Sequence, residues 1–249
     1  MGERRELHWL PTKTRRSIEA AVTGAERALG SRLEAAVLVG AAASPARADR
    51  ARAPQVLVIT SDLPGTQLRE LAAQVHDAMR ANVRVRVLTS GELTRSCDVF
   101  ALEVAEWRDR HVSLRGDDPF ADCTIEDADL VRSLEAAARG LVRRLRNRVL
   151  ADLGTDGRRD DAANAVGDAI ERSFVIAHHY LALDAEPPAE EAALLDAISE
   201  AAGLDPKPVH ALHEELRSRG RVAKPVDAAV TLLPWLEGIV ELVDRASEA

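Results

Sequence analysis

The chain has 249 residues, of which 46% are apolar and 30% are charged, and this composition is typical of a globular protein rather than of a disordered or fibrous one. Its formal net charge of −8 argues against a surface that grips nucleic acid or an anionic membrane along its whole extent. We therefore expect neither nucleic acid nor a membrane among its partners.

The sequence also indicates a cellular compartment. No apolar segment follows Arg4 and Arg5 near the N-terminus, so a signal peptide is not expected, and no stretch reaches the roughly 20 uncharged apolar residues of a membrane helix. Cys97 and Cys123 match no metal-ligand spacing and are too few for a disulfide scaffold. We expect a cytoplasmic protein in which both thiols are reduced.

The N-terminal half predicts alternating helices and strands. Apolar residues recur at helical spacing in two segments, and three short β-branched runs have the length and composition of strands. Thr89 and Glu92 have the spacing of a capping box, which predicts a short helix beginning there. The expected elements, in chain order, are a helix over 14–29, a strand over 35–39, a loop over 41–54, a strand over 56–59, a helix over 68–79 and a strand over 83–87.

The C-terminal half predicts helices only, separated by glycine and proline. The expected helices cover 127–150, 160–182, 189–202, 207–218 and 226–246. The charge changes at the same point, because residues 1–120 carry 18 basic and 16 acidic side chains, whereas the remainder carries 15 and 25. We therefore expect an α/β (α+β) fold in which a small sheet flanked by helices, over 1–126, precedes an all-α helical bundle, over 127–249.

The strand at 35–39 ends in Gly40, and a loop leads from it to a second strand within 53–60. This arrangement resembles the nucleotidyltransferase superfamily, which includes DNA polymerase beta and the minimal nucleotidyltransferases. In that family the first strand ends in Gly-Ser and the second carries Asp-x-Asp. Segments near 87–93 and 116–120 and the helix over 130–150 are also similar to one bacterial branch, so the chain is identified as a degenerate bacterial member with a C-terminal helical domain.

The resemblance implies a nucleotide site at the turn after the first strand, with Gly40, Ala41 and Ser44 as candidate loop residues whose backbone N–H groups approach the phosphates. The same alignment places Pro54 and Val56 where the family has its two metal-binding aspartates. Neither side chain offers the oxygen ligands that Mg²⁺ requires. We therefore expect no catalytic residue, no metal and no cofactor, and a noncatalytic protein that binds a nucleotide or acts in assembly.

An alternative is an active nucleotidyltransferase whose carboxylates come from other positions. Asp49, in the loop before the second strand, is the candidate, and this enzyme would need Mg²⁺ with a nucleoside triphosphate. Asp62 follows the same strand and is better explained as a turn residue.

The helical half contains three further candidates. Arginines on one face of the helix over 130–150 are expected to be solvated or to pair with acids of the same half. Arg172 and His179 resemble the Arg-His signature of HEPN-family ribonucleases, which implies an RNA-cleaving alternative. His210 and His213 have a spacing compatible with a metal, but no third ligand is identifiable, so we expect them at the surface. The apolar faces of this half would suit its own core, a protein partner or a homodimer.

Overall fold

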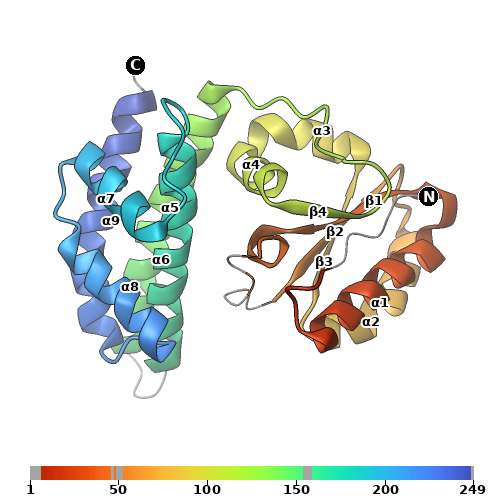
Figure 1. Cartoon of the computed structure of the whole chain (residues 1–249), viewed down its shortest axis with the longest axis horizontal. Helices are drawn as coiled ribbons and strands as arrows, with labels where there is room; N and C mark the ends of the chain where they lie inside the picture. The colour runs from red at the N-terminus through yellow and green to blue at the C-terminus, as the bar shows by residue number, and fades with distance from the viewer. Residues whose placement is uncertain (1–6, 46–47, 49–52, 154–158, 248–249) are drawn as a thin grey trace. The chain divides into compact units, whose positions relative to one another are not determined.

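The computed structural model describes residues 7–45, 48, 53–153 and 159–247. The chain divides into two compact units, Met1–Ile125 and Glu126–Ala249, which are an α/β unit and a helical unit (Figure 1). Among the described residues there is no helix that combines the length and the apolar composition needed to cross a membrane.

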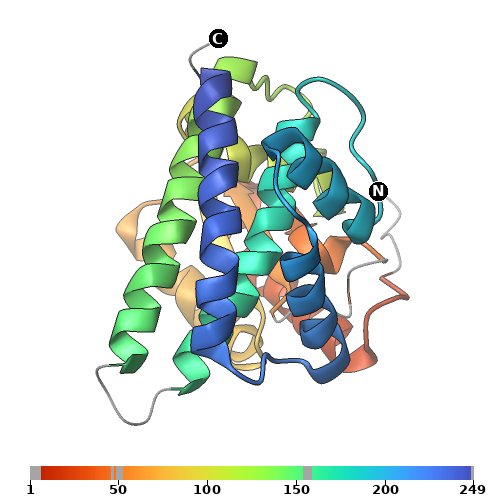
Figure 2. The ribbon, with the colours of Figure 1, turned by 90° about the vertical axis from the view of Figure 1, so that its left-hand side faces the viewer.

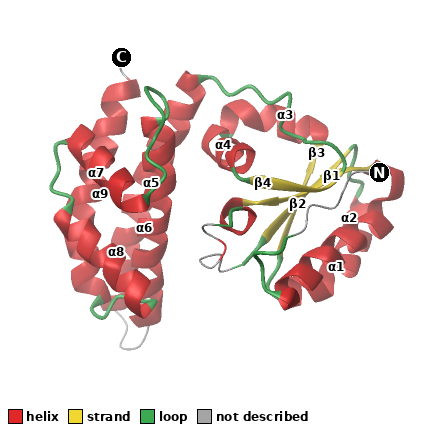
Figure 3. Ribbon diagram, in the orientation of Figure 1, coloured by secondary structure: helices red, strands yellow, loops and turns green. Residues whose placement is uncertain are grey.

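A four-stranded mixed sheet forms the centre of the α/β unit (Figure 3). Its strands are β1 (Leu33–Val39), β2 (Gln55–Thr60), β3 (Arg84–Thr89) and β4 (His111–Arg115), in the order β3-β2-β1-β4. Strand β1 runs antiparallel to β2 and β4, whereas β2 and β3 are parallel. The three predicted strands are confirmed; β4, which lies at the edge beside β1, was not predicted.

One face of the sheet packs against α1 (Thr12–Leu29) and α2 (Gly65–Arg80). Alternate residues of β1 and β2 point into this cluster, including Leu38, Val56 and Val58, all fully buried. The two helices approach each other closely at Gly24, where an added Cβ would lie 2.6 Å from the backbone oxygen of Gln74. Both helices are predicted from their apolar periodicity.

The opposite face packs against α3 (Ser90–Val99) and α4 (Ala101–Asp109). The predicted capping box begins α3, because Glu92 donates its N–H to the Thr89 hydroxyl at 3.1 Å and accepts the Thr89 N–H at 2.8 Å. The Thr89 N–H and the Thr89 hydroxyl, which both donate to the Glu92 carboxylate, lower the pKa of Glu92. Trp107 of α4 fills the cluster beneath β1 and β2 and is 6% exposed.

In the second unit, the described residues form five helices: α5 (Asp127–Leu153), α6 (Arg159–Leu181), α7 (Glu191–Ala202), α8 (Lys207–Arg219) and α9 (Pro225–Ser247). Each described end lies within three residues of the predicted one. Long helices α5, α6 and α9 pack against one another, and α7 and α8 pack against α6 and α9. Figure 2 shows α5 (green) beside α9 (dark blue).

The expectation of two reduced thiols is wrong. Cys97 of α3 and Cys123 of the segment 116–125 form a disulfide, with their Cα atoms 6.4 Å apart. The segment folds back after β4 and brings together two residues that are 26 apart in the chain, a non-local contact that residue spacing does not reveal.

Candidate functional site

The predicted nucleotide loop forms a short 3-10 turn, η2 (Gly40–Ala43), directly after β1. Gly40 has φ +74°, a conformation that glycine adopts without steric cost. Two amides of the loop are engaged inside the protein, since Gly40 donates to the backbone oxygen of Arg110 at 2.9 Å and Ser44 donates to that of Ala41 at 3.1 Å. These two amides are therefore not available to a ligand in this conformation.

The N-terminal segment braces the same turn. Trp9 donates its indole N–H to the backbone oxygen of Ala42 at 3.1 Å, and Ala42 is itself only 1% exposed. Sequence analysis did not single out Trp9, because nothing in the local pattern links it to a turn 33 residues away.

The positions that the resemblance assigns to metal-binding aspartates are both buried. Pro54 precedes β2, and Val56 lies in the apolar cluster beneath α1 and α2 with 0% exposure. Neither side chain carries an oxygen ligand, and a fully buried valine is surrounded by carbon rather than by water. These residues do not fit a hydrated Mg²⁺ ion.

Asp49 and Asp62 are the two carboxylates nearest along the chain to the positions of the family's aspartates. Asp49 lies outside the described residues. Asp62 is exposed at the end of β2, where its carboxylate pairs with the Arg32 guanidinium at 2.8 Å and its backbone oxygen accepts the Thr60 hydroxyl at 3.0 Å. The interpretation of Asp62 as a turn residue is consistent with these contacts.

Strand register aligns three positions along one edge of the sheet, the edge at which β1 ends and β2 and β3 begin. Val39, the residue before Gly40, pairs with Gln55, and Gln55 pairs with Arg84 on β3. Adjacent strands lie about 4.8 Å apart, so Arg84 is roughly 10 Å from the end of β1. Arg84 donates its backbone N–H to the oxygen of Pro54 at 2.8 Å. Its side chain is exposed and forms no ion pair with any residue that the structure describes.

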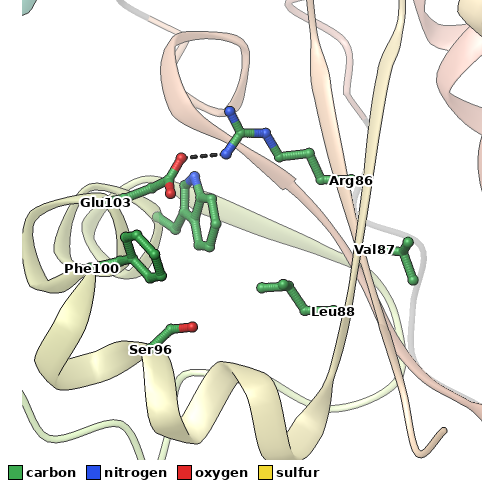
Figure 4. Close-up of a pocket in the computed structure, with 7 residues that line it drawn as sticks. Arg86, Val87, Leu88, Ser96, Phe100 and Glu103 are labelled. Atoms are coloured by element: carbon green, nitrogen blue, oxygen red, sulfur yellow. Dashed lines mark hydrogen bonds and ion pairs between the residues drawn. The ribbon is translucent and has the colours of Figure 1, made fainter. Parts of the chain in front are cut away.

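A cavity of about 270 Å³ lies between β3, α3 and α4. Figure 4 shows Arg86 reaching across it to Glu103, with which it forms an ion pair. The Arg86 guanidinium also lies 5.7 Å from the centre of the buried Trp107 ring, within range of a cation–π interaction. Phe100, on the same cavity, is 55% exposed. Because α4 was not predicted, sequence analysis missed this cavity.

Another cavity, of about 320 Å³, lies where α3 meets the segment 116–125. Both cysteines of the disulfide line it. Its acidic lining residues are Glu34, Asp117, Asp118 and Asp122. None of these residues was predicted as a site residue.

The α5 arginines pair within the helical unit. Arg139 contacts Glu135 at 2.8 Å and Asp244 of α9 at 2.7 Å, and these two acids raise its pKa. Arg146 reaches Glu237 of α9 at 2.6 Å. The interpretation that this stripe pairs with acids of its own half is confirmed for these two residues.

The pair proposed for RNA cleavage lies on α6. His179 is 4% exposed and packs edge-on against the His178 ring, with centroids 5.1 Å apart, whereas Arg172 is half-buried. A general acid or base must reach the proton that it transfers. The low exposure of His179 therefore does not favour an RNA-cleaving site at this pair.

The expectation that both α8 histidines lie at the surface is wrong for His213. It is 7% exposed, its Nε2 lies 3.1 Å from Glu191 Oε2 of α7, and its ring packs edge-on against Phe174. His210 contacts Asp196 of α7 at 2.7 Å. The two histidines thus connect α8 to α7 through separate carboxylates and do not converge on one metal.

Comparison with known proteins identifies the fold. The sequence matches no protein-family model and no curated protein. Its structure is similar to that of spectinomycin adenyltransferase from Enterococcus faecialis, solved with ATP and spectinomycin, with a TM-score of 0.59 and 11% identity over 92% of this chain and 99% of that one. A nucleotidyltransferase-like protein from Exiguobacterium sibiricum 255-15 is 17% identical over 92% of this chain and 74% of that one, with a TM-score of 0.34. The chain therefore has a nucleotidyltransferase-like fold, in which a small α/β unit precedes a helical unit.

Proposed function

We propose that this chain binds a nucleotide without transferring it. The observation that carries the proposal is the chemistry of positions 54 and 56, where a proline and a fully buried valine stand in place of the carboxylates that the family pattern uses to hold metal. Phosphoryl transfer on this type of fold depends on metal ions that neutralise the phosphate charge. Without ligands for them, binding is the activity that this edge of the sheet supports best.

Arg84 supplies positive charge at that edge. Its register beside Gln55, and the register of Gln55 beside Val39, place an exposed guanidinium in line with the Gly40 turn. The span of roughly 10 Å suits a phosphate chain that runs from the turn to the arginine. A guanidinium binds phosphate through charge-assisted, bidentate hydrogen bonds and needs no metal.

The solved structure with a similar fold indicates which ligand to test first. The Enterococcus faecialis adenyltransferase is described with ATP, so a nucleoside triphosphate is the first ligand to test. If no nucleotide binds, a role in assembly is the other noncatalytic function to consider.

Thermal-shift titrations of the full chain with ATP, CTP, GTP and UTP in EDTA test the proposal. A nucleotide should raise Tm in the absence of metal, and Arg84→Ala should reduce that shift. Arg69→Ala is the matched control, because Arg69 is also exposed and lies near the start of α2, the helix that follows the opposite end of β2. Equal shifts in both variants would refute the role of Arg84 while leaving nucleotide binding in place.

An assay for nucleotidyl transfer, with Mg²⁺ or Mn²⁺, tests the alternative enzyme. Transfer that disappears in Asp49→Ala would replace the noncatalytic proposal with the active one. No transfer under either metal is the expected result.

A further inference from the structure

We propose that Cys97 and Cys123 form a reversible redox site, at which a small thiol reductant opens the disulfide and releases the end of the segment 116–125 from α3. The two residues come from different parts of the α/β unit, and their Cα separation of 6.4 Å lies within the usual range for disulfides.

The two sulfurs differ in their access to solvent. Cys97 is 7% exposed and belongs to the apolar cluster that contains Leu93 and Trp107. Cys123 is half-buried and packs against the edge of the same cluster, and both cysteines line the cavity between α3 and the segment 116–125. A thiolate in solution therefore reaches Sγ of Cys123 first, and Sγ of Cys97 is the leaving group.

The exchange proceeds in two steps. The reductant's thiolate attacks Sγ of Cys123, the S–S bond breaks, and the electron pair leaves on Sγ of Cys97, which takes a proton from solvent. A second thiolate then attacks the reductant's sulfur in the mixed disulfide and releases Cys123, which is protonated in turn. Overall, two thiols are oxidised to one external disulfide, and the cysteine pair gains two electrons and two protons.

The reduced form of Cys97 has an acceptor in place. Its Sγ lies 3.4 Å from the backbone oxygen of Leu93, one turn earlier in α3. A new S–H group at this position can donate to that oxygen, so reduction does not leave an unpaired polar group in the apolar cluster.

The segment has other anchors besides the disulfide, including Ile125, which packs against the same apolar cluster as Cys97. Gly116 sits directly against the backbone of Glu34, and Phe120 is 2% exposed, with its N–H donated to Asp118 at 2.9 Å. The disulfide is the covalent bond that ties the residues after Phe120 to α3. Reduction should therefore loosen the residues around Cys123, within 121–125, more than 116–120, which keep the contacts of Gly116 and Phe120.

The consequence is a change in the cavity that the disulfide lines. Asp122 and Cys123 contribute to its wall from the part of the segment that reduction releases, whereas Ser90 and Thr94 contribute from α3. The redox state thus controls access to an acidic cavity of about 320 Å³, at a place distinct from the Gly40 turn.

Intact-mass analysis of the full chain, alkylated with N-ethylmaleimide under denaturing conditions, tests the chemistry. The protein purified without reductant should take up no alkyl group, and protein treated natively with dithiothreitol should take up two. After removal of dithiothreitol and exposure to glutathione disulfide, uptake should return to zero. Two groups without reductant, or none after native reduction, would overturn the proposal.

Amide hydrogen exchange on the oxidised and reduced forms tests the structural effect. Exchange at 121–125 should accelerate on reduction, while α1 and α2 serve as the internal control and stay unchanged. Uniform acceleration over the whole α/β unit, or none at all, would overturn the release of this segment.

Two serine variants test which of the two sulfurs is attacked. In Cys97→Ser the accessible Cys123 thiol remains, and in Cys123→Ser the buried Cys97 thiol remains. Native Cys97→Ser protein should form a mixed disulfide with glutathione disulfide faster than native Cys123→Ser protein. The opposite order would refute the assigned point of attack.

Discussion

The burial of Val56 makes a sharp prediction about the position that the resemblance assigns to a metal-binding aspartate. Its side chain is fully buried in the cluster beneath α1 and α2. Replacing it with aspartate removes about 1.5–3 kcal/mol of apolar burial and places a carboxyl group among carbon atoms, which costs roughly 1–3 kcal/mol more even when the group is neutral. We expect Val56→Asp to lower the free energy of unfolding by about 4 kcal/mol, a large share of the 5–15 kcal/mol typical of a domain.

Urea denaturation followed by circular dichroism and tryptophan fluorescence measures this loss. Val99→Asp is the matched control, because it makes the same substitution at a valine that is 65% exposed, and it should change stability by less than about 0.5 kcal/mol. A Val56→Asp protein with wild-type stability, and above all one that Mg²⁺ stabilises, would refute the reasoning, since position 56 would then face a hydrated site.

Three further perturbations have defined outcomes. Gly116→Ala should cost roughly 2–5 kcal/mol in a urea titration, because Gly116 has φ +74° and an added Cβ would lie 2.0 Å from the Glu34 backbone oxygen; wild-type stability would contradict this. Thr89→Ala should cost about 1 kcal/mol and raise the pKa of Glu92 toward its ordinary value, seen by carboxyl-carbon NMR. Because the folded pKa of Glu92 is lowered, its capping contribution is present above the unfolded pKa and fades as pH falls through the folded one. Thr89→Ala should weaken this dependence without removing it, because residue 89 keeps the backbone N–H that donates to the Glu92 carboxylate. Reducing the disulfide should lower the free energy of unfolding by about 3.5 kcal/mol, since it closes a loop of 26 residues; an unchanged urea midpoint with dithiothreitol would contradict this.

The fold was predictable where the signal is local. Helices α5 to α9 follow from apolar periodicity with glycine and proline breaks, and α3 follows from its capping box. Strand β4 was missed because only Val112 and Leu114 are apolar in it, and its five residues gain strand geometry by pairing with β1. Short strands at a sheet edge depend on such a partner more than on their own composition.

The candidate site was predictable only in part. The strand that carries Arg84 was predicted, but the alignment of Arg84 with Gly40 depends on the pairing of three strands. His213 illustrates the same limit, because its burial depends on Glu191 of α7 meeting it across the bundle. Strand register and helix packing are tertiary features, and sequence spacing along one element does not encode them.

The metal dependence of nucleotide binding tests the central claim most directly. The full chain is titrated with each nucleoside triphosphate, once in EDTA and once in Mg²⁺, and Tm is followed. At about 100 times the dissociation constant a ligand adds about 2.7 kcal/mol of stability. A shift of equal size in both conditions is the predicted result for a noncatalytic binder without metal ligands. A shift that appears only with Mg²⁺ would contradict the account, because nucleotide binding would then depend on the metal.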